Sequence, residues 1–317
     1  MKKGKISGAR SVVKALETQA VEVIFGYPGG ANLPLYDELA RSSLRHVLAR
    51  HEQGAAHMAD GYARATGKIG VCTATSGPGA TNLVTGIATA YMDSSALVAI
   101  TGQVSRHLIG NDAFQEVDTT GITIPITKHN YLLQNAEDIS RTLTEAFYLA
   151  GSGRRGPVLV DIPKDVFLEQ CTPGDAEPPH LEGYRPTLKG HPGQIKRAAA
   201  IIKAAERPLI IVGGGIQSQT AYEALAALAC SRLSHSGWDA PGSWSTSSPR
   251  MWSASPTIGM SACTFLPTSA GSMSMWTILA WGAKCSVLPV ERSPKRVATP
   301  MMTSAWVMAV LAAMRPW

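Results

Sequence analysis

Short apolar runs alternate with longer helical segments along the first 170 residues, and this alternation is the strongest constraint on the fold. Apolar runs of strand length occupy residues 21–25, 45–48, 69–74, 96–101 and 157–162. Helical patterns occupy residues 7–18, 33–41, 52–67, 136–150 and the segment from the Ser76 turn to Met92. Apolar strands that alternate with helices are typical of a parallel sheet covered on both faces. The sequence therefore predicts an α/β domain, with a parallel sheet flanked by helices, over residues 1–171.

A second domain is expected to begin after a linker. Residues 172–192 are rich in Pro and Gly and have no apolar period, which predicts a linker. Helical patterns at 194–205 and 217–229 then flank an apolar run at 208–212, which leads into Gly213-Gly214-Gly215. A strand followed by a glycine turn and a helix is a weak dinucleotide-binding signal. Residues 193–230 are therefore predicted to start a Rossmann-like α/β domain.

Composition changes abruptly after residue 230. All seven Trp residues lie at position 238 or later, and residues 231–317 contain sixteen Ser and eight Pro without an amphipathic period. Two interpretations remain open: a natural low-complexity, disordered tail, or a frameshifted reading of the rest of the second domain. Trp is scarce in disordered tails, so the frameshift is favoured.

Charge and cysteine usage argue against several classes of protein. The net charge is +6, but the basic residues beyond residue 230 are scattered rather than arranged in a stripe, so no nucleic-acid partner is expected. The five Cys have no CxxC or metal-ligand spacing, which indicates reduced thiols, a cytoplasmic location and no metal site. There is no apolar h-region at the start and no run of 18 apolar residues, so neither a signal peptide nor a membrane span is expected.

Glu52 is the first candidate functional residue. It begins an Ala-rich helical run, within Arg50-His51-Glu52-Gln53-Gly54. A carboxylate among Gly and Ala neighbours is expected to be poorly solvated, and such a group can share a proton with a heteroaromatic nitrogen. The alternative is a solvated Glu that the helix dipole favours at a helix N-terminus.

Two glycine-rich turns follow predicted strands. Ser76-Gly77-Pro78-Gly79 opens a helix and is either an anion-binding N-terminus or a plain tight turn. It lacks the Gly-Lys-Ser/Thr of a P-loop, so a nucleotide phosphate site is not expected. Tyr27-Pro28-Gly29-Gly30 on its own indicates only a turn.

Taken together, these segments resemble one family. The order of motifs is similar to that in the N-terminal third of acetolactate synthase catalytic (large) subunits, which are thiamine-diphosphate enzymes. The resemblance rests on Phe25–Gly30, Arg50–Gly54, Ala74–Asn82, Ala99–Val104, Asp112–Glu116, Thr127–Tyr131 and Gly156–Asp165. It is dense from Ile6 to Phe167, weakens toward Cys230 and then stops.

The resemblance assigns roles to individual residues. It implies that Glu52 shares a proton with the aminopyrimidine ring of the cofactor, whose pocket is lined by Tyr27, Pro28, Gly77, Pro78 and Asn82. It implies that Phe114, Gln115 and Lys164 lie around the reacting carbon and the keto-acid site. FAD would be contacted by Arg154 and by the turn at Gly213 and Gly214. Without the neighbouring motifs, Phe114 would be read as a core aromatic and Lys164 as a solvated loop cation.

The resemblance also implies an activity: decarboxylation of pyruvate and ligation of the two-carbon unit to a second 2-keto acid. The partners expected from the family are a homodimer, or a heteromer with large and small regulatory subunits. The family holds Mg²⁺ and the cofactor diphosphate on a Gly-Asp-Gly…Asn motif, and no Gly-Asp-Gly occurs in this sequence. Two alternatives stay open: a non-catalytic fragment that pairs with full-length subunits, and another thiamine carboligase such as sulfoacetaldehyde acetyltransferase. A nicotinamide dehydrogenase is disfavoured, because no Gly-x-Gly-x-x-Gly follows an N-terminal strand.

Overall fold

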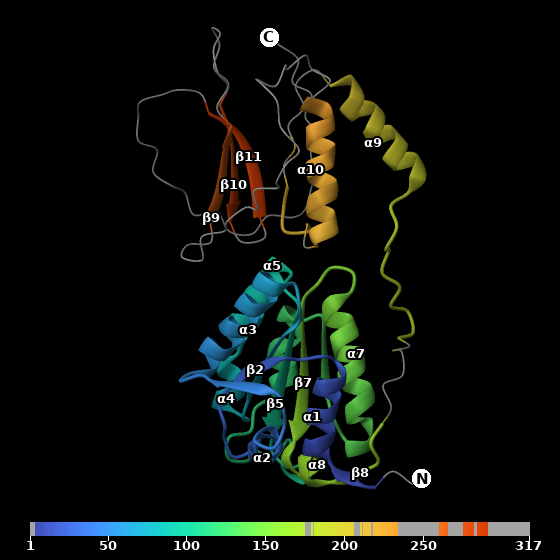
Figure 1. Cartoon of the computed structure of the whole chain (residues 1–317). Helices are drawn as coiled ribbons and strands as arrows, with labels where there is room; N and C mark the ends of the chain where they lie inside the picture. Colours follow the sequence, from blue (N-terminus) through green and yellow to red (C-terminus); the bar gives the residue numbers. More distant parts are fainter. Residues whose placement is uncertain are drawn as a thin grey trace. The chain divides into compact units, whose positions relative to one another are not determined.

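The first 188 residues of the chain form one compact unit and the rest a second unit. The computed structural model describes residues 4–174, 179, 181–205, 210, 212–216, 218–233, 260–265, 275–281 and 284–290. The first unit is built on a six-stranded sheet with the strand order β3-β2-β4-β5-β7-β6, in which every neighbouring pair is parallel (Figure 1). The predicted parallel α/β fold is therefore confirmed.

The strands and helices of the first unit follow one another as the sequence predicts, with several additions. The strands of the sheet are β2 (Val23–Gly26), β3 (Arg45–Leu48), β4 (Gly70–Ala74), β5 (Leu97–Gln103), β6 (His129–Leu132) and β7 (Pro157–Pro163). The helices are α1 (Gly8–Thr18), α2 (Leu33–Leu39), α3 (Glu52–Thr66), α4 (Pro78–Asn82), α5 (Val84–Asp93), α6 (Thr119–Thr123), α7 (Ile139–Gly151) and α8 (Lys164–Leu168). Strand β6 and helices α6 and α8 are additions, and the helix predicted up to Met92 is divided into α4 and α5.

Helix ends form where the side chains satisfy free backbone groups. Ser7 caps α1 by accepting a hydrogen bond from the backbone N–H of Arg10 at 3.2 Å. His51 caps α3 in the same way, with Nδ1 accepting from the N–H of Gln53 at 3.2 Å. Gly67 ends α3 in the left-handed conformation, at φ 72°, which Gly adopts without a Cβ penalty. These caps fix where α3, and hence Glu52, begins.

Alternate residues of each strand pack on opposite faces of the sheet. Helices α1, α2, α7 and α8 cover one face, where they bury Ile24, Val71, Val98, Ile100, Val158 and Val160. Helices α3 and α5 cover the other face, over Val23, Phe25, Cys72, Leu97, Ala99 and Leu159 (Figure 1). Both faces of the central strands are thus shielded from solvent, as expected for strands with continuous apolar sequences.

Cys72 lies in the second of these clusters, on β4. Its side chain is fully buried, and burial raises the pKa of its thiol to about 12. It is a free cysteine, as is the buried Cys171.

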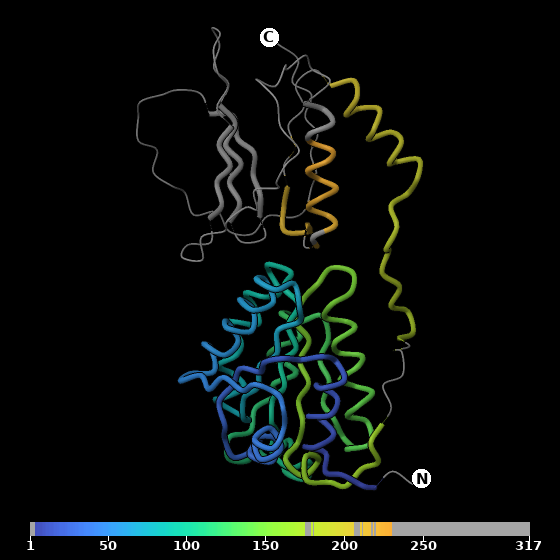
Figure 2. The backbone as a smooth tube through the Cα atoms, in the orientation of Figure 1, coloured from blue at the N-terminus to red at the C-terminus, as the bar shows by residue number. Residues whose placement is uncertain are grey.

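The two ends of the first unit lie side by side. The short strand β1 (Ile6–Ser7) pairs antiparallel with β8 (Gln170–Cys171), so that Ile6 is opposite Cys171. In Figure 2 the blue start of the tube accordingly runs close to the yellow-green segment that ends this domain's fold. Part of the predicted linker is packed on this unit: Tyr184 accepts a hydrogen bond from the Lys128 ammonium at 3.1 Å and packs its ring on Tyr148. The chain is therefore anchored to the first unit beyond residue 171.

The second unit contains helices and an antiparallel sheet. Its helices are α9 (Pro192–Ala204) and α10 (Gln219–Leu233), close to the two predicted helices. Its strands β9 (Met260–Phe265), β10 (Met275–Trp281) and β11 (Lys284–Val290) pair antiparallel in the order β11-β10-β9. The sequence did not predict these strands. Most of the strand predicted at 208–212 lies outside the described residues, and the frameshift hypothesis for 231–317 stays a prediction.

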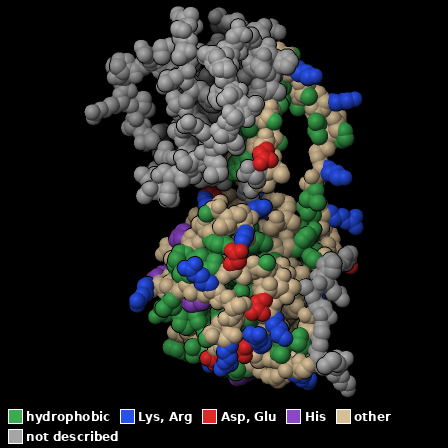
Figure 3. Space-filling model, in the orientation of Figure 1, with side chains coloured by type: hydrophobic (Ala, Val, Ile, Leu, Met, Phe, Trp, Pro, Cys, Tyr) green, Lys and Arg blue, Asp and Glu red, His purple; other side chains and the backbone are tan. Residues whose placement is uncertain are grey.

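Charged side chains on one face of the first unit do not gather into a single patch (Figure 3). On the face of the first unit in Figure 3, Lys and Arg side chains are scattered among acidic and apolar ones. Within the described ranges, no helix combines the length and apolar character needed to cross a bilayer.

Two helical glycines give a matched test of the packing between α3 and α5. A Cβ at Gly86 would overlap the side chain of the fully buried Ala56, whereas a Cβ at Gly61 would meet open space. Gly86→Ala should therefore lower the free energy of unfolding by about 1–3 kcal/mol through overpacking. Gly61→Ala should raise it by up to about 1 kcal/mol through helix propensity.

Urea unfolding followed by circular dichroism at 222 nm measures both changes. Tryptophan fluorescence would not report on this unit, because every Trp lies at 238 or later. Equal effects of the two substitutions would contradict the close helix contact.

Candidate functional site

Most of the predicted site residues come together at one edge of the sheet. Parallel strands place all their carboxyl ends at the same edge, and each of five strands is followed there by a predicted residue or pair. These are Tyr27-Pro28 after β2, Glu52 after β3, Gly77-Pro78 after β4, Phe114-Gln115 after β5 and Lys164 after β7. Strands β2 and β4 are neighbours although β3 lies between them in sequence. Such a switch point opens a crevice where α/β proteins bind ligands.

Thr75 joins the loops that follow β2 and β4. Its hydroxyl accepts a hydrogen bond from the N–H of Ala31 at 3.1 Å. A Cβ at Gly29 would lie 2.5 Å from Thr75 Cβ, and one at Gly79 would lie 2.7 Å from Thr75 Cγ2. Both positions therefore require glycine, because a side chain at either one would collide with the buried Thr75. Sequence reasoning did not single out Thr75, and its position directly after a buried strand was the available signal.

Asn32 holds the Tyr27 loop in shape. Its side chain is fully buried, its Oδ1 accepts from the N–H of Gly29 at 2.8 Å, and its Nδ2 donates to the carbonyl of Tyr27 at 3.4 Å. Tyr27 itself is 40% exposed. Asn32 was also missed from the sequence, because an Asn beside glycines usually indicates only a turn.

Glu52 faces the turn that follows β4. Its Oε2 accepts a hydrogen bond from Asn82 Nδ2 at 3.0 Å. Its Oε1 lies 3.4 Å from where a Cβ at Gly79 would be, and no donor among the described residues reaches that oxygen. Glu52 is half-buried, beside the fully buried Ala55 and Ala56. The carboxylate is therefore oriented by one amide, with one oxygen left for a further donor.

A half-buried tyrosine, Tyr36, adds to the electrostatics of this region. The Tyr36 hydroxyl lies 3.1 Å from His46 Nε2, and the two rings meet edge to face with centroids 4.9 Å apart. Burial raises the pKa of Tyr36, and the charges of Cys72 and Glu52 raise it further. Burial also lowers the pKa of His46. Both groups are thus biased toward their neutral forms.

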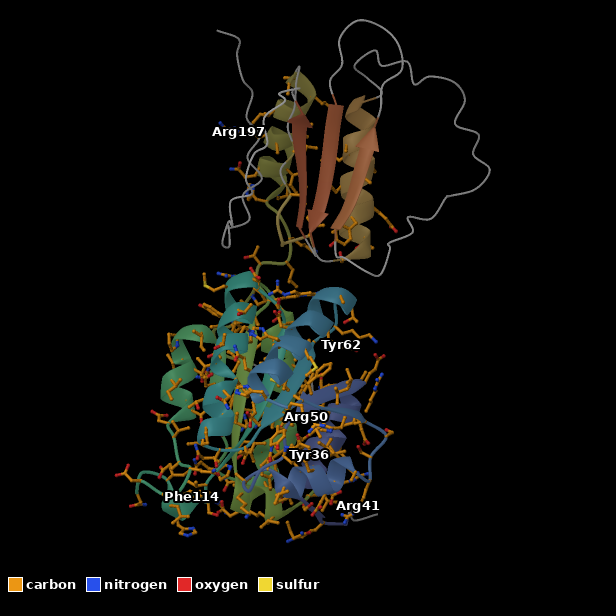
Figure 4. The ribbon with its side chains drawn as sticks, turned by 90° about the vertical axis from the view of Figure 1, so that its left-hand side faces the viewer. Tyr36, Arg41, Arg50, Tyr62, Phe114 and Arg197 are labelled. Atoms are coloured by element: carbon orange, nitrogen blue, oxygen red, sulfur yellow. The ribbon has the colours of Figure 1, made fainter. Side chains whose placement is uncertain are left out.

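The loop with Phe114 and Gln115 lies against the glycine turn. Gly77 has φ +57°, and a Cβ there would lie 2.5 Å from the carbonyl oxygen of Gln115. Phe114 is 88% exposed, at the periphery of the unit in Figure 4, so it is not a core aromatic. The Glu116 carboxylate accepts from the backbone N–H groups of Gly110 and Ala113, and these bonds lower the pKa of Glu116.

Lys164 and Arg154 lie at opposite edges of the sheet. Lys164 is exposed at the start of α8, directly after β7. Arg154 precedes β7, where its Nε donates to Ser94 Oγ at 2.8 Å and its guanidinium lies 5.7 Å from the Tyr91 ring centroid. The structure therefore does not bring Arg154 to the Glu52 site. Gly213 and Gly214 belong to the second unit.

A fully buried carboxylate, Asp161, lies near the carboxyl end of β7. Asp161 is 1% exposed, and it accepts hydrogen bonds from Thr101 Oγ1 at 2.6 Å and from Gln103 Nε2 at 3.0 Å. Burial raises the pKa of Asp161 to about 7, although both hydrogen bonds oppose the shift. The sequence did not single out Asp161, because this residue lies within an apolar strand. Among the described residues, no three His, Cys, Asp or Glu side chains gather as metal ligands.

Comparison with known proteins agrees with this geometry. Residues 6–122 match the family "Thiamine pyrophosphate enzyme, N-terminal TPP binding domain". The chain is 58% identical over 228 residues to the acetolactate synthase large subunit of Mycobacterium tuberculosis, covering 71% of this chain and 37% of that protein. It is 54% identical over 230 residues to an acetolactate synthase of Arthrospira platensis, covering 71% and 40%. The chain thus spans about two fifths of the length of these relatives.

The raised pKa of Asp161 predicts a pH-dependent stability. An unfolded Asp titrates near pH 4, so between about pH 4 and 7 the folded state binds more protons and stability falls as pH rises. Asp161→Asn removes this titration. The free energy of unfolding of the wild type, minus that of the variant, should therefore be larger at pH 5 than at pH 8.

Urea unfolding by circular dichroism at the two pH values measures this difference. Asp37→Asn, at an exposed position on α2, is the matched control and should give the same difference at both. A difference for Asp161→Asn that does not change with pH would contradict the prediction.

Proposed function

We propose that the first unit is the pyrimidine-binding half of an acetolactate synthase active site, because residues 6–122 match the thiamine pyrophosphate enzyme N-terminal domain. The observation that carries the proposal is the Glu52 carboxylate, which Asn82 orients toward Gly79 at the β2/β4 switch point. The assembled enzyme would decarboxylate pyruvate and join the two-carbon unit to a second 2-keto acid.

The chemistry of the donor set fits thiamine diphosphate. The aminopyrimidine ring is flat and carries ring nitrogen, so it needs a proton-sharing carboxylate and walls without bulky side chains. Glu52 Oε1 is available to such a nitrogen, and Gly29, Gly77 and Gly79 keep the walls thin. When bound, the cofactor supplies a carbon nucleophile that attacks the keto group of the substrate.

The residues of this chain then have separate tasks. Glu52 would share a proton at Oε1 with the ring nitrogen, while Asn82 fixes the plane of the carboxylate. Tyr27, Pro28, Gly77 and Pro78 would line the pocket of the ring. Phe114 and Gln115 cover the keto-acid position, and Lys164 attracts the substrate carboxylate.

The other cofactors and the partners belong to the assembled enzyme. Arg154, Gly213 and Gly214 are proposed FAD contacts. The described residues do not fit a Mg²⁺ site, so Mg²⁺ would be held by another part of the enzyme. We propose assembly as a homodimer, or with large and small regulatory subunits, in the cytoplasm.

A non-catalytic role is the second candidate. The chain spans about two fifths of its relatives, and its sequence contains no Gly-Asp-Gly motif. A chain with only the pyrimidine half could pair with full-length subunits without turning over substrate. A different thiamine carboligase, such as sulfoacetaldehyde acetyltransferase, would use the same half-site with another acceptor.

Exchange of the N-terminal segment tests the proposed function. Residues 1–171 of this chain would replace the corresponding segment of the Mycobacterium tuberculosis large subunit, and acetolactate would be measured colorimetrically as acetoin. The chimera should be active, and Glu52→Gln should lower kcat by about 100-fold or more, as expected for loss of a positioned acid–base group.

Glu22→Gln is the matched control for this substitution. Glu22 is an exposed carboxylate that pairs with Lys68 before β2, away from the proposed site, and its removal should leave kcat unchanged. A folded, active chimera in which Glu52→Gln has no effect would overturn the role of Glu52.

The chain on its own should not make acetolactate. The cofactor needs an anchor for its diphosphate as well as its pyrimidine, and loss of several charge-assisted contacts of about 1.5–3 kcal/mol each would weaken binding by orders of magnitude. Purified chain would be assayed with pyruvate, Mg²⁺, FAD and excess thiamine diphosphate. Turnover above the blank would show that another part of the chain supplies the diphosphate site.

A further inference from the structure

The buried pair of Asp161 and Gln103 connects the centre of the sheet to the loop that carries Phe114 and Gln115. Gln103 is the last residue of β5 and is 3% exposed. Its Nε2 donates to Asp161 Oδ2 at 3.0 Å and to the backbone carbonyl of Val117 at 2.9 Å. Its Oε1 accepts from the N–H of Val104 at 2.9 Å. The amide therefore has both donors and its acceptor engaged.

Asp161 determines which way this amide faces. The Oδ2 atom of Asp161 accepts a hydrogen bond from the amide, so it selects the NH₂ end of Gln103 and not the oxygen. With that end fixed, the second N–H of the amide points to Val117. Thr101 contributes a hydrogen bond to the other carboxylate oxygen without touching the loop.

The loop that contains Val117 is held together by its own hydrogen bonds. The Glu116 carboxylate ties Gly110 and Ala113 together, and the backbone N–H of Glu116 donates to the Ala113 carbonyl at 2.9 Å. The start of the loop is fixed separately, because Arg106 Nε donates to Asp165 Oδ2 at 2.7 Å. Movement at Val117 would therefore displace Gln115 from Gly77.

We propose that Asp161 and Gln103 are positioning residues, which hold the Phe114-Gln115 loop against the Gly77 turn through the Val117 carbonyl. We call these three groups the loop clamp. The importance of the clamp for turnover rests on the proposed function, whereas its effect on the loop rests on geometry alone. Neither residue need touch substrate or cofactor.

Limited chymotrypsin digestion of the full chain tests the clamp. Phe114 is 88% exposed in the loop, and Phe167 is fully buried in the core. Mass spectrometry would follow cleavage after each of them. Cleavage after Phe114 reports opening of the loop, and cleavage after Phe167 reports general unfolding.

Gln103→Glu should raise the rate of cleavage after Phe114 by about tenfold, because it replaces the donor amide with an acceptor facing a carboxylate and a carbonyl. Asp161→Leu should have a similar effect. Asp161→Asn should stay near the wild-type rate, because its amide oxygen can still accept from Gln103 while its NH₂ donates to Thr101. Thr101→Val is the matched control, since it removes a bond to the same carboxylate and leaves the link to Val117.

An unchanged rate after Phe114 in Gln103→Glu and Asp161→Leu would overturn the clamp, as would equal increases after Phe114 and Phe167. The digestion needs no cofactor, so its result is independent of the proposed function. In an active chimera, Gln103→Glu should in addition lower kcat/KM, while Thr101→Val should not. Inactivity of the chimera together with loop release in the digestion would refute the proposed function and leave the clamp standing.

Discussion

Parallel strand pairing is the constraint on which the rest of the first unit depends. Because β2, β3, β4, β5 and β7 all run in one direction, the segments that leave them begin at one edge of the sheet. Residues that are more than 100 positions apart in sequence, such as Glu52 and Lys164, are thereby placed at that common edge. Arg154 shows the converse: it precedes its strand, so the same rule places it at the other edge.

At the β2/β4 switch point, glycines allow the loops that leave the common edge to pack closely against one another. Gly29, Gly77 and Gly79 each lie so near another segment that a Cβ would collide with Thr75 or with the Gln115 backbone. Glycine is needed at these three positions because the neighbouring segment leaves no room for a side chain. Of the three, only Gly77 also has a positive φ that other residues rarely adopt. The walls that result are made of backbone and a single threonine, which is a rigid surface against which a flat ring can pack.

The sequence predicted what depends on local pattern. The strand and helix order, the Ser7 cap and the start of α3 at Glu52 all follow from periodicity and capping chemistry. Strand β6 was missed because His129–Leu132 is short and half-exposed at the edge of the sheet, so it lacks an apolar run. The contacts of Thr75, Asn32 and Gln103 join segments whose approach is set by the sheet order, which no local pattern encodes. Asp161 was not singled out because its neighbours in sequence are apolar, and only the pairing of β5 with β7 brings Thr101 opposite it and Gln103 within reach.

The enclosed thiol of Cys72 has a chemical consequence. Thiol oxidation and disulfide exchange proceed through the thiolate, and a thiol with a pKa of about 12 is almost wholly protonated in neutral solution. Cys72 is also shielded from oxidants by the helices packed over β4. Cys72 consequently reacts only slowly with oxidants and disulfides, whatever the redox poise of its surroundings.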